Sequence, residues 1–373
     1  MKFRVERDVL AEAIAWTARG LPARPAVPVL GGVLLEVADS RLTVSGFDYE
    51  VSNQVELEVQ TSAGGRTLVS GRLLADITKA LPPHPVDLAA DGPRVTIACG
   101  TSRFTLPTMP VEDYPALPVM PTTAGVVDSG EFAVAVGQVA VAAGRDDTLP
   151  MLTGVRLEFE GEQLRLAATD RYRLAVRELL WKPERPDLEA AVLVPARTLA
   201  ETAKTLTTGS TITLALSSGG AGEGMIGFVG PGRRTTTRLL DAEFPKYRSL
   251  FPSEWGGTAD LAVPPLVEAV KRVALVADRG TPVRLEFTEE GLALTAGGED
   301  EGRAEEQVEV SYTGEPLTIA FNPTYLLDGL GAVRAATARL SFTTSTKPAV
   351  LTAVDGDGSV DYRYLIMPVR LPG

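Results

Sequence analysis

The sequence predicts an α+β fold of three similar domains, each with two helices packed on antiparallel sheets. Hydrophobic residues make up 45% of the 373 residues, which is enough to bury several cores. Similar segments recur at a constant interval along the chain. Between them, apolar and polar residues alternate over short stretches, a pattern typical of half-buried antiparallel strands. At roughly 150 residues per domain, a chain of this length corresponds to two or three domains.

Each third of the chain begins with a similar segment that leads into a short helical pattern. The three segments start at Phe3, Phe132 and Leu261, and 129 residues separate each start from the next. A regular interval of this kind indicates an internally repeated structural unit.

A run of alternating residues follows each opening and turns back into a partner strand. The runs and their partners are 33–37 with 41–44, 155–159 with 163–166, and 283–287 with 291–294. Because successive side chains of a strand point to opposite faces, such runs predict antiparallel hairpins with one buried face.

A second helix then recurs in each third, introduced by 68–71, 193–196 and 319–323. In chain order, the six expected helices are 8–20, 72–80, 131–145, 196–206, 264–277 and 323–334. About two dozen short strands surround them, so antiparallel sheet dominates the expected architecture.

Breaks rich in proline and glycine separate the three thirds, at 115–125 and at 252–257. We therefore expect domains at 1–122, 127–253 and 258–373. Unpaired sheet edges invite aggregation. Similar domains can remove these edges by joining edge to edge and closing into a ring.

The composition excludes several kinds of site. The single Cys99 excludes an internal disulfide framework and cysteine-built zinc or iron–sulfur centres, and the single His84 excludes a histidine-rich metal site. No apolar run approaches the roughly 18 residues of a membrane span, and no signal-peptide core follows Met1. We therefore expect a cytoplasmic protein without a cofactor or a bound metal.

The net charge of −12 comes from 36 basic and 48 acidic residues, and it normally argues against nucleic acid as a partner. The charge is unevenly distributed, however. The six expected helices together carry +2, which leaves −14 for the strands and loops. One slightly basic surface could therefore face a polyanion. Solvated helix faces carry Lys and Arg in any protein, so that ordinary explanation stays open.

Six short motifs are spread from the beginning of the chain to its end. They are Met1-Lys-Phe-Arg-Val-Glu-Arg-Asp8, Arg24-Pro25-x-x-Pro28-Val-Leu30, Ala168-Thr-Asp-Arg-Tyr-Arg-Leu-Ala175, Glu243-Phe-Pro-Lys-Tyr247, Phe321-Asn-Pro-x-Tyr-Leu326 and Leu365-Ile-Met-Pro-Val-Arg-Leu371. Together and in this order, the six motifs are highly specific for a single protein family. The chain resembles the bacterial DNA polymerase III beta subunit family, the sliding clamps, and its richness in Ala, Arg and Gly is most similar to actinobacterial members.

The resemblance implies a non-enzymatic head-to-tail homodimer, a ring of six domains with helices lining the hole and sheets outside. Such a ring encircles double-stranded DNA and holds it by topology, so a mildly positive lining that slides along phosphates is sufficient. An acidic exterior then no longer argues against DNA. The implied clients are the replicative DNA polymerase, the clamp loader and other proteins that carry clamp-binding peptides. Tethering raises the effective concentration of a polymerase at the primer end.

The first site that the resemblance implies is the DNA-facing lining. Arg24 matches a DNA-contacting arginine of the family, and the other candidates are basic residues of the expected helices. The full set is Arg24, Arg72, Lys79, Arg197, Lys204, Lys271 and Arg334.

The second implied site is a groove between the second and third domains for short peptides that contain Gln and Leu or Phe. The matching positions are Leu152, Thr169, Arg171, Tyr172, Arg173, Leu174, Pro245, Ser249, Leu250, Met367, Pro368, Val369 and Arg370. Many family members have a Gly-His pair where this chain has Arg171-Tyr172, and Ser249 replaces a basic residue found in some. Peptide preference is therefore expected to differ. Taken without the resemblance, the same residues are more typical of an ordinary inter-domain core.

The third implied site is the subunit interface, where an acidic segment meets basic residues of the partner's first domain around an apolar centre. The candidates are Arg72, Arg103, Ala274, Leu275, Val276, Glu299, Asp300, Glu301, Glu305 and Glu306. A solvated acidic loop is the alternative interpretation.

Two other functions remain as alternatives to the clamp. A carboxylate-dependent hydrolase or nuclease would use Asp146, Asp147 or Asp170 and would show metal-dependent turnover. A DNA-independent adaptor would bind short peptides in the same groove but would not be retained on circular DNA. Internal triplication and the terminal motif favour the clamp.

Overall fold

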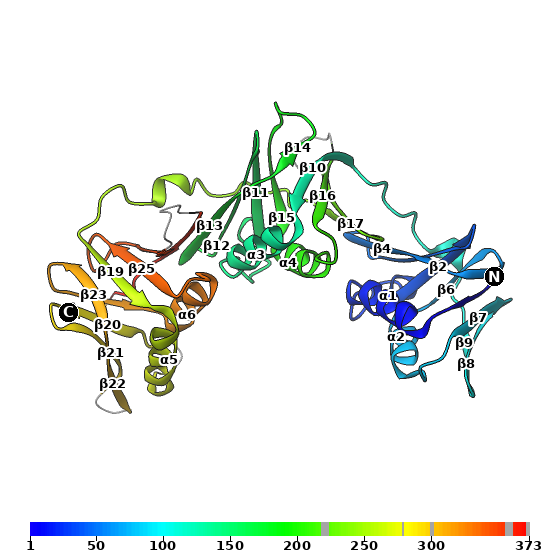
Figure 1. Ribbon diagram of the computed structural model, residues 1–373, viewed down its shortest axis with the longest axis horizontal. Helices are drawn as coiled ribbons and strands as arrows, with labels where there is room; N and C mark the ends of the chain where they lie inside the picture. The colour runs from blue at the N-terminus through cyan, green and yellow to red at the C-terminus, as the bar shows by residue number, and fades with distance from the viewer. Residues whose placement is uncertain (218–223, 278–279, 299–301, 355–360, 371–373) are drawn as a thin grey trace. The chain divides into compact units, whose positions relative to one another are not determined.

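The computed structural model describes residues 1–217, 224–277, 280–298, 302–354 and 361–370, in two compact units (Figure 1). The first unit comprises Met1–Ser129 and Lys204–Leu239, and the second comprises Gly130–Ala203 and Leu240–Gly373. The α-helices of the described residues are α1 (Arg7–Arg19), α2 (Gly71–Ala80), α3 (Ser129–Ala140), α4 (Ala196–Thr205), α5 (Val263–Val273) and α6 (Pro323–Ala332).

All six expected helices are present, but two of them end earlier than the sequence predicts. The helix predicted at 131–145 stops at Ala140, where Ala142 and Ala143 donate to carbonyls three residues back in tight turns. The helix predicted at 264–277 stops at Val273 and continues only as a 3₁₀ turn, η5 (Ala274–Val276). In both places apolar periodicity continues past the point where the backbone leaves the α-helical hydrogen-bond pattern.

Local sequence explains how α6 begins. The Asn322 side chain accepts hydrogen bonds from the backbone N–H groups of Thr324 (2.9 Å) and Tyr325 (3.4 Å), and Pro323 occupies the first helical position. Asparagine satisfies two of the N–H groups that a helix start leaves free, and proline has no N–H to satisfy there.

Two antiparallel sheets dominate the first unit, with α1 and α2 packed together beside them (Figure 1). One sheet has the order β5-β1-β7-β8-β9, and the other contains the order β10-β16-β17-β18-β4-β3-β2-β6. The strands are β1 (Lys2–Val5), β2 (Gly32–Ala38), β3 (Arg41–Phe47), β4 (Val51–Glu58), β5 (Gln60–Ala63), β6 (Gly65–Ser70), β7 (Val86–Asp91), β8 (Arg94–Cys99), β9 (Ser102–Pro107), β10 (Thr122–Asp128), β16 (Thr211–Leu216), β17 (Met225–Gly230) and β18 (Arg233–Arg238).

The second unit is also built on two antiparallel sheets, with α5 and α6 packed against each other (Figure 1). The sheet orders are β15-β11-β12-β13-β27-β26-β25-β19-β23 and β22-β21-β20-β24. The strands are β11 (Gly154–Glu160), β12 (Gln163–Thr169), β13 (Arg173–Leu180), β14 (Lys182–Pro183), β15 (Glu189–Pro195), β19 (Gly257–Ala262), β20 (Val283–Thr288), β21 (Gly291–Gly297), β22 (Arg303–Val308), β23 (Val310–Gly314), β24 (Leu317–Phe321), β25 (Thr337–Phe342), β26 (Ala349–Ala353) and β27 (Tyr362–Ile366).

The three hairpins predicted from alternation are confirmed. β2 pairs with β3, β11 with β12, and β20 with β21, all antiparallel. Their inward-facing residues, such as Leu35, Leu157 and Leu285, have no exposed surface. Period-two patterning was therefore sufficient to identify both the strands and their buried faces.

Sheets also continue from one repeated domain to the next. β18 pairs with β4 from Arg233↔Val55 to Thr237↔Val51. β13 pairs with β27, with Leu174 opposite Leu365. The first of these pairings explains why residues 204–239 group with the beginning of the chain.

In the described part of the chain, no helix is both long and apolar enough to cross a membrane.

Candidate partner groove and DNA-facing residues

The turn between β12 and β13 presents two of the predicted groove side chains to solvent. The Asp170 carboxylate accepts hydrogen bonds from the backbone N–H groups of Tyr172 and Arg173, both at 3.1 Å. Such local bonds are the reason Asp favours tight turns. Arg171 has a positive φ of 80°, a conformation that glycine adopts more easily, and the Arg171 and Tyr172 side chains are both exposed.

Arg173, in contrast, turns its guanidinium into the protein, where its side chain is only 7% exposed. It donates to the carboxylates of Asp170 (Nε to Oδ2, 2.9 Å) and Asp328 (Nη1 to Oδ2, 2.5 Å). Burial alone would lower the pKa of Arg173, but Tyr364 and the two carboxylates outweigh burial and raise that pKa. Arg173 thus connects the turn, through Asp170, to α6, through Asp328.

An aromatic pair connects the turn to α6. The Tyr172 ring stacks on the Tyr325 ring, with centroids 6.1 Å apart and an interplanar angle of 22°. The Arg173 guanidinium carbon lies 4.4 Å from the centroid of the same Tyr325 ring, a cation–π contact. Tyr172 remains 54% exposed, so the stack presents aromatic surface at the rim of the predicted groove.

Residues 367–370, which we call the tail, lie beside this turn. After β27, the Met367 N–H donates to the Tyr172 carbonyl and the Val369 N–H donates to the Ala320 carbonyl, both at 2.8 Å. Because backbone bonds hold both residues, the tail has a defined position, and the Met367 side chain is 37% exposed there.

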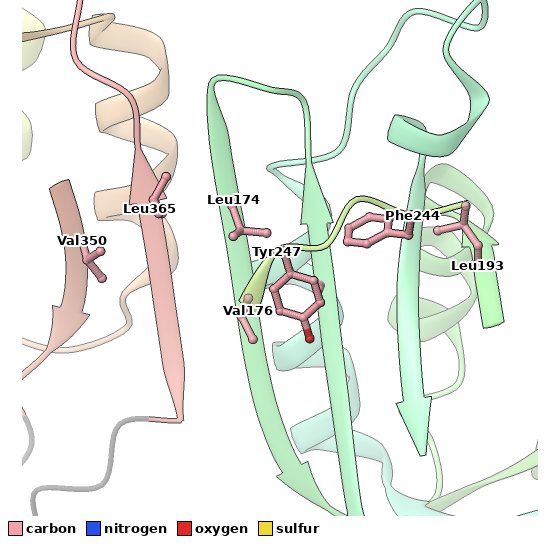
Figure 2. Packing of buried hydrophobic residues seen from close by; sticks show 8 residues of the cluster. Leu174, Val176, Leu193, Phe244, Tyr247, Val350 and Leu365 are labelled. Atoms are coloured by element: carbon pink, nitrogen blue, oxygen red, sulfur yellow. The ribbon is translucent and has the colours of Figure 1, made fainter. Parts of the chain in front are cut away.

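Residues 240–251, which we call the strap, are the third segment of the candidate groove, after the turn and the tail. Phe244 and Tyr247 are each 4% exposed and pack in a cluster with residues of β13, β15, β26 and β27. Figure 2 shows Phe244 between Tyr247 and Leu193, and the Tyr247 ring beside Val176. The buried Phe244 and Tyr247 side chains anchor the strap to the sheet. The strap residues predicted for the groove are exposed, namely Pro245, Ser249 and Leu250.

Glu158 on β11 is the polar centre beneath the strap. Its side chain is 8% exposed and accepts from the Arg156 Nε (2.6 Å), the Tyr247 hydroxyl (3.0 Å) and the Arg248 Nη2 (2.7 Å). Burial alone would raise the pKa of Glu158, but these hydrogen bonds outweigh it and lower the pKa to about 2. The carboxylate is therefore charged at neutral pH.

A cavity of about 760 Å³ opens next to this centre. It is lined by Arg156, Glu158, Phe159, Glu160, Glu189, Ala190, Ala191, Glu243, Phe244, Pro245, Lys246, Tyr247, Arg248 and Ser249. Both signs of charge occur on its walls, so charge does not favour one class of ligand.

The structure thus brings together the turn, the tail and the strap, which are far apart in the sequence. Leu152 lies in the 3₁₀ turn η3 (Pro150–Leu152) before β11 and is 7% exposed.

Sequence reasoning did not select Glu158, Tyr247, Arg248, Tyr325, Asp328 or Tyr364. Tyr247 and Tyr325 belong to two of the six family motifs, and that membership could have identified them as candidates. Nothing in the local pattern indicates that Glu158 meets Arg248, because 90 residues separate them.

All seven candidate DNA-facing residues have exposed side chains. Arg72 donates to the Pro22 carbonyl at 3.4 Å, which places it next to the loop that carries Arg24. Lys271 pairs with Glu268 one turn earlier, at 2.8 Å. This exposed pair is worth little energetically and leaves the ammonium accessible.

The candidate interface residues are surface residues where the structure describes them. Leu275 in η5 is 84% exposed, and Arg72, Arg103 and Glu305 are exposed too. Glu306 accepts from Arg272 of the same chain, Nε to Oε2 at 3.0 Å. Glu299, Asp300 and Glu301 lie outside the described residues.

Two of the three carboxylates considered for catalysis, Asp146 and Asp170, take part in local hydrogen bonds. Asp146 accepts from the Thr148 hydroxyl (2.6 Å), and that bond is the main reason its pKa is lowered. Asp170 organises the β12–β13 turn. Among the described residues, no group of three or more His, Cys, Asp or Glu side chains could hold a metal ion.

Comparison with known families decides between the alternatives. Profiles of the DNA polymerase III beta subunit match its N-terminal domain to residues 1–118, its central domain to 126–246 and its C-terminal domain to 248–370. The chain belongs to this family. It is a DNA sliding clamp, a non-catalytic processivity factor of DNA replication, and the family implies a homodimer that encircles DNA.

Relatives and solved structures agree with this assignment over the whole chain. The beta sliding clamp of Streptomyces coelicolor is 60% identical over 376 residues and covers 100% of both chains. The beta sliding clamp homolog GriR of Streptomyces muensis is 48% identical over 99% of both chains. The griselimycin-bound DnaN sliding clamp of Pseudomonas aeruginosa superimposes with a TM-score of 0.92 at 29% identity, covering 100% of both chains. The predicted three-domain α+β clamp fold and its actinobacterial character are confirmed.

Proposed function

We propose that two copies of this chain join head to tail into a closed six-domain ring around double-stranded DNA in the cytoplasm, with domains at 1–122, 127–253 and 258–373. Sheet pairing from β18 to β4 and from β13 to β27 supports the proposal, because it continues a sheet from each domain into the next. The predicted interface residues would extend the same arrangement across the subunit boundary.

The seven exposed basic residues face the DNA in this proposal. A ring that holds DNA by topology needs only a weak, sequence-independent attraction to phosphates, and scattered single cations supply it. Tight binding to DNA would hinder sliding, so this proposal does not require high affinity.

The predicted groove receives client peptides of the replicative polymerase, the clamp loader and other partners. The observation that carries this proposal is the convergence of the turn, the tail and the strap. Each presents an exposed apolar side chain (Tyr172, Met367 and Leu250) on a backbone held by buried contacts. An exposed apolar patch on a rigid frame is the usual requirement for an anchor residue of a peptide.

Fluorescence anisotropy with a labelled short peptide, Gln at its start and Leu-Phe at its end, tests the groove. We expect saturable binding to the wild-type protein and at least tenfold weaker binding to Met367→Asp, because a charge in an apolar site must be desolvated. Leu180→Asp is a matched control, since Leu180 is 70% exposed on β13 and does not belong to the predicted groove. Equal affinity of all three proteins would contradict the proposal.

The adaptor alternative is separated by retention on DNA. A loaded ring stays on closed circular DNA during gel filtration and leaves after the circle is cut, whereas a peptide adaptor elutes separately in both cases. The expected result is retention that depends on circularity.

A further inference from the structure

A row of alternating charges crosses one face of the large sheet in the second unit. Arg165 on β12 donates to Glu158 (3.3 Å) on β11 and to Glu178 (2.9 Å) on β13. Glu178 in turn accepts from Arg363 (3.1 Å) on β27, the strand that leads into the tail. The register places Arg165 opposite both Glu158 and Glu178, and it places Arg363 opposite Val176, diagonally across from Glu178. The row therefore joins four strands on one face.

Two consecutive strap residues are attached to this row. The Tyr247 hydroxyl donates to Glu158, and the Arg248 Nη2 donates to both Glu158 and Glu160, each at 2.7 Å. Farther along, the guanidinium of Arg363 lies 4.8 Å from the centroid of the Phe251 ring. The row therefore holds both sides of the 3₁₀ turn η4 (Arg248–Leu250).

We propose that Glu158 is a positioning residue for the candidate groove: through Tyr247 and Arg248 it fixes the strap that presents Ser249 and Leu250 to a bound peptide. The inference rests on the peptide-binding function proposed above and goes beyond it. It assigns a role in recognition to a carboxylate that contacts no candidate groove residue through a described hydrogen bond.

Physical reasons favour this role over simple stabilisation of the sheet. Ser249 and Leu250 are exposed, so they have little packing of their own to define their position. A binding loop that is already ordered loses less entropy when a partner binds, which increases affinity without adding a contact. Charge-assisted hydrogen bonds to a buried carboxylate are strong and directional enough to supply that order.

Three substitutions at Arg248 and Glu158 test the inference with the labelled peptide described above. Arg248 is 59% exposed, so Arg248→Met should leave the fold intact while it removes the attachment. Both hydrogen bonds leave from one nitrogen, Nη2, so Arg248→Lys can keep them with a single ammonium. Glu158→Gln removes the charge at the other end. Glu189→Gln, an exposed carboxylate of the same cavity wall, is the matched control.

We expect roughly tenfold weaker peptide binding for Arg248→Met and Glu158→Gln, and near wild-type affinity for Arg248→Lys and Glu189→Gln. Amide hydrogen exchange in 244–251 should become faster in the two weakened variants before peptide is added. Unchanged affinity in Arg248→Met, measured while Met367→Asp weakens binding, would overturn the inference and leave the groove proposal in place. Failure of the wild-type protein to bind the peptide would remove both.

Discussion

At the residue scale, the buried Glu158 carboxylate predicts a specific loss of stability in acid. Its pKa falls from an ordinary 4.5 to about 2, because its hydrogen bonds outweigh the effect of burial. The folded state thus takes up this proton less readily than the unfolded state. The resulting stabilisation, about 3 kcal/mol, is present above pH 4.5 and is lost as the pH falls toward 2.

Urea unfolding at about pH 6 and about pH 3 measures this contribution. The free energy of unfolding of the wild-type protein should fall more across that interval than that of Glu158→Gln, in which nothing titrates at this position. Equal decreases in the two proteins would show that another group controls acid stability.

Arg173 is the second residue with a clear energetic consequence. Arg173→Met leaves the carboxylates of Asp170 and Asp328 without their shared cation, and breaking a buried pair in this way costs about 3 kcal/mol. The neighbouring Arg171→Met, at an exposed position, should change stability by less than about 0.5 kcal/mol. Chemical denaturation of both variants checks the difference.

At the scale of elements, α6 packs so closely on β27 that one of its glycines has no room for a larger side chain unless a neighbour shifts. A Cβ added at Gly329 would lie 2.5 Å from the Tyr364 ring, whereas a Cβ added at Gly331 of the same helix would meet nothing within 4 Å. Alanine raises helix propensity by about 1 kcal/mol at either position, but overpacking costs about 1–3 kcal/mol.

We therefore expect Gly329→Ala to lower the melting temperature and Gly331→Ala to raise it slightly. Differential scanning calorimetry of the two variants makes the comparison with helix propensity held constant. A higher melting temperature for Gly329→Ala would mean that Tyr364 can move aside at little cost.

At the scale of the whole molecule, the exposed Leu275 allows a test of the predicted subunit contact. Leu275 is 84% exposed on a short 3₁₀ turn, and its side chain would be buried in the proposed dimer. Sedimentation velocity should show a dimer for the wild-type protein and at least tenfold weaker association for Leu275→Asp. The exposed Leu180→Asp variant serves as the control and should remain dimeric.

Much of the fold was readable from the sequence because it depends on local spacing. Period-two runs identified the hairpins of all three thirds, and the regular interval between Phe3, Phe132 and Leu261 identified the repeated unit. The helix ends at 145 and 277 were wrong because apolar spacing does not record where backbone hydrogen bonds change. The domain bounds and the roles of the site residues remain predictions.

The sequence by itself thus determined the class of fold, the three-fold repetition and, through its ordered motifs, the family. Only the tertiary structure decided which residues support the candidate groove. Glu158 meets Arg248, and Arg173 meets Asp328, across 90 and 155 residues of chain. Periodicity reports the direction of a side chain relative to its own element. It does not report which distant partner the packing of strands brings to that side chain.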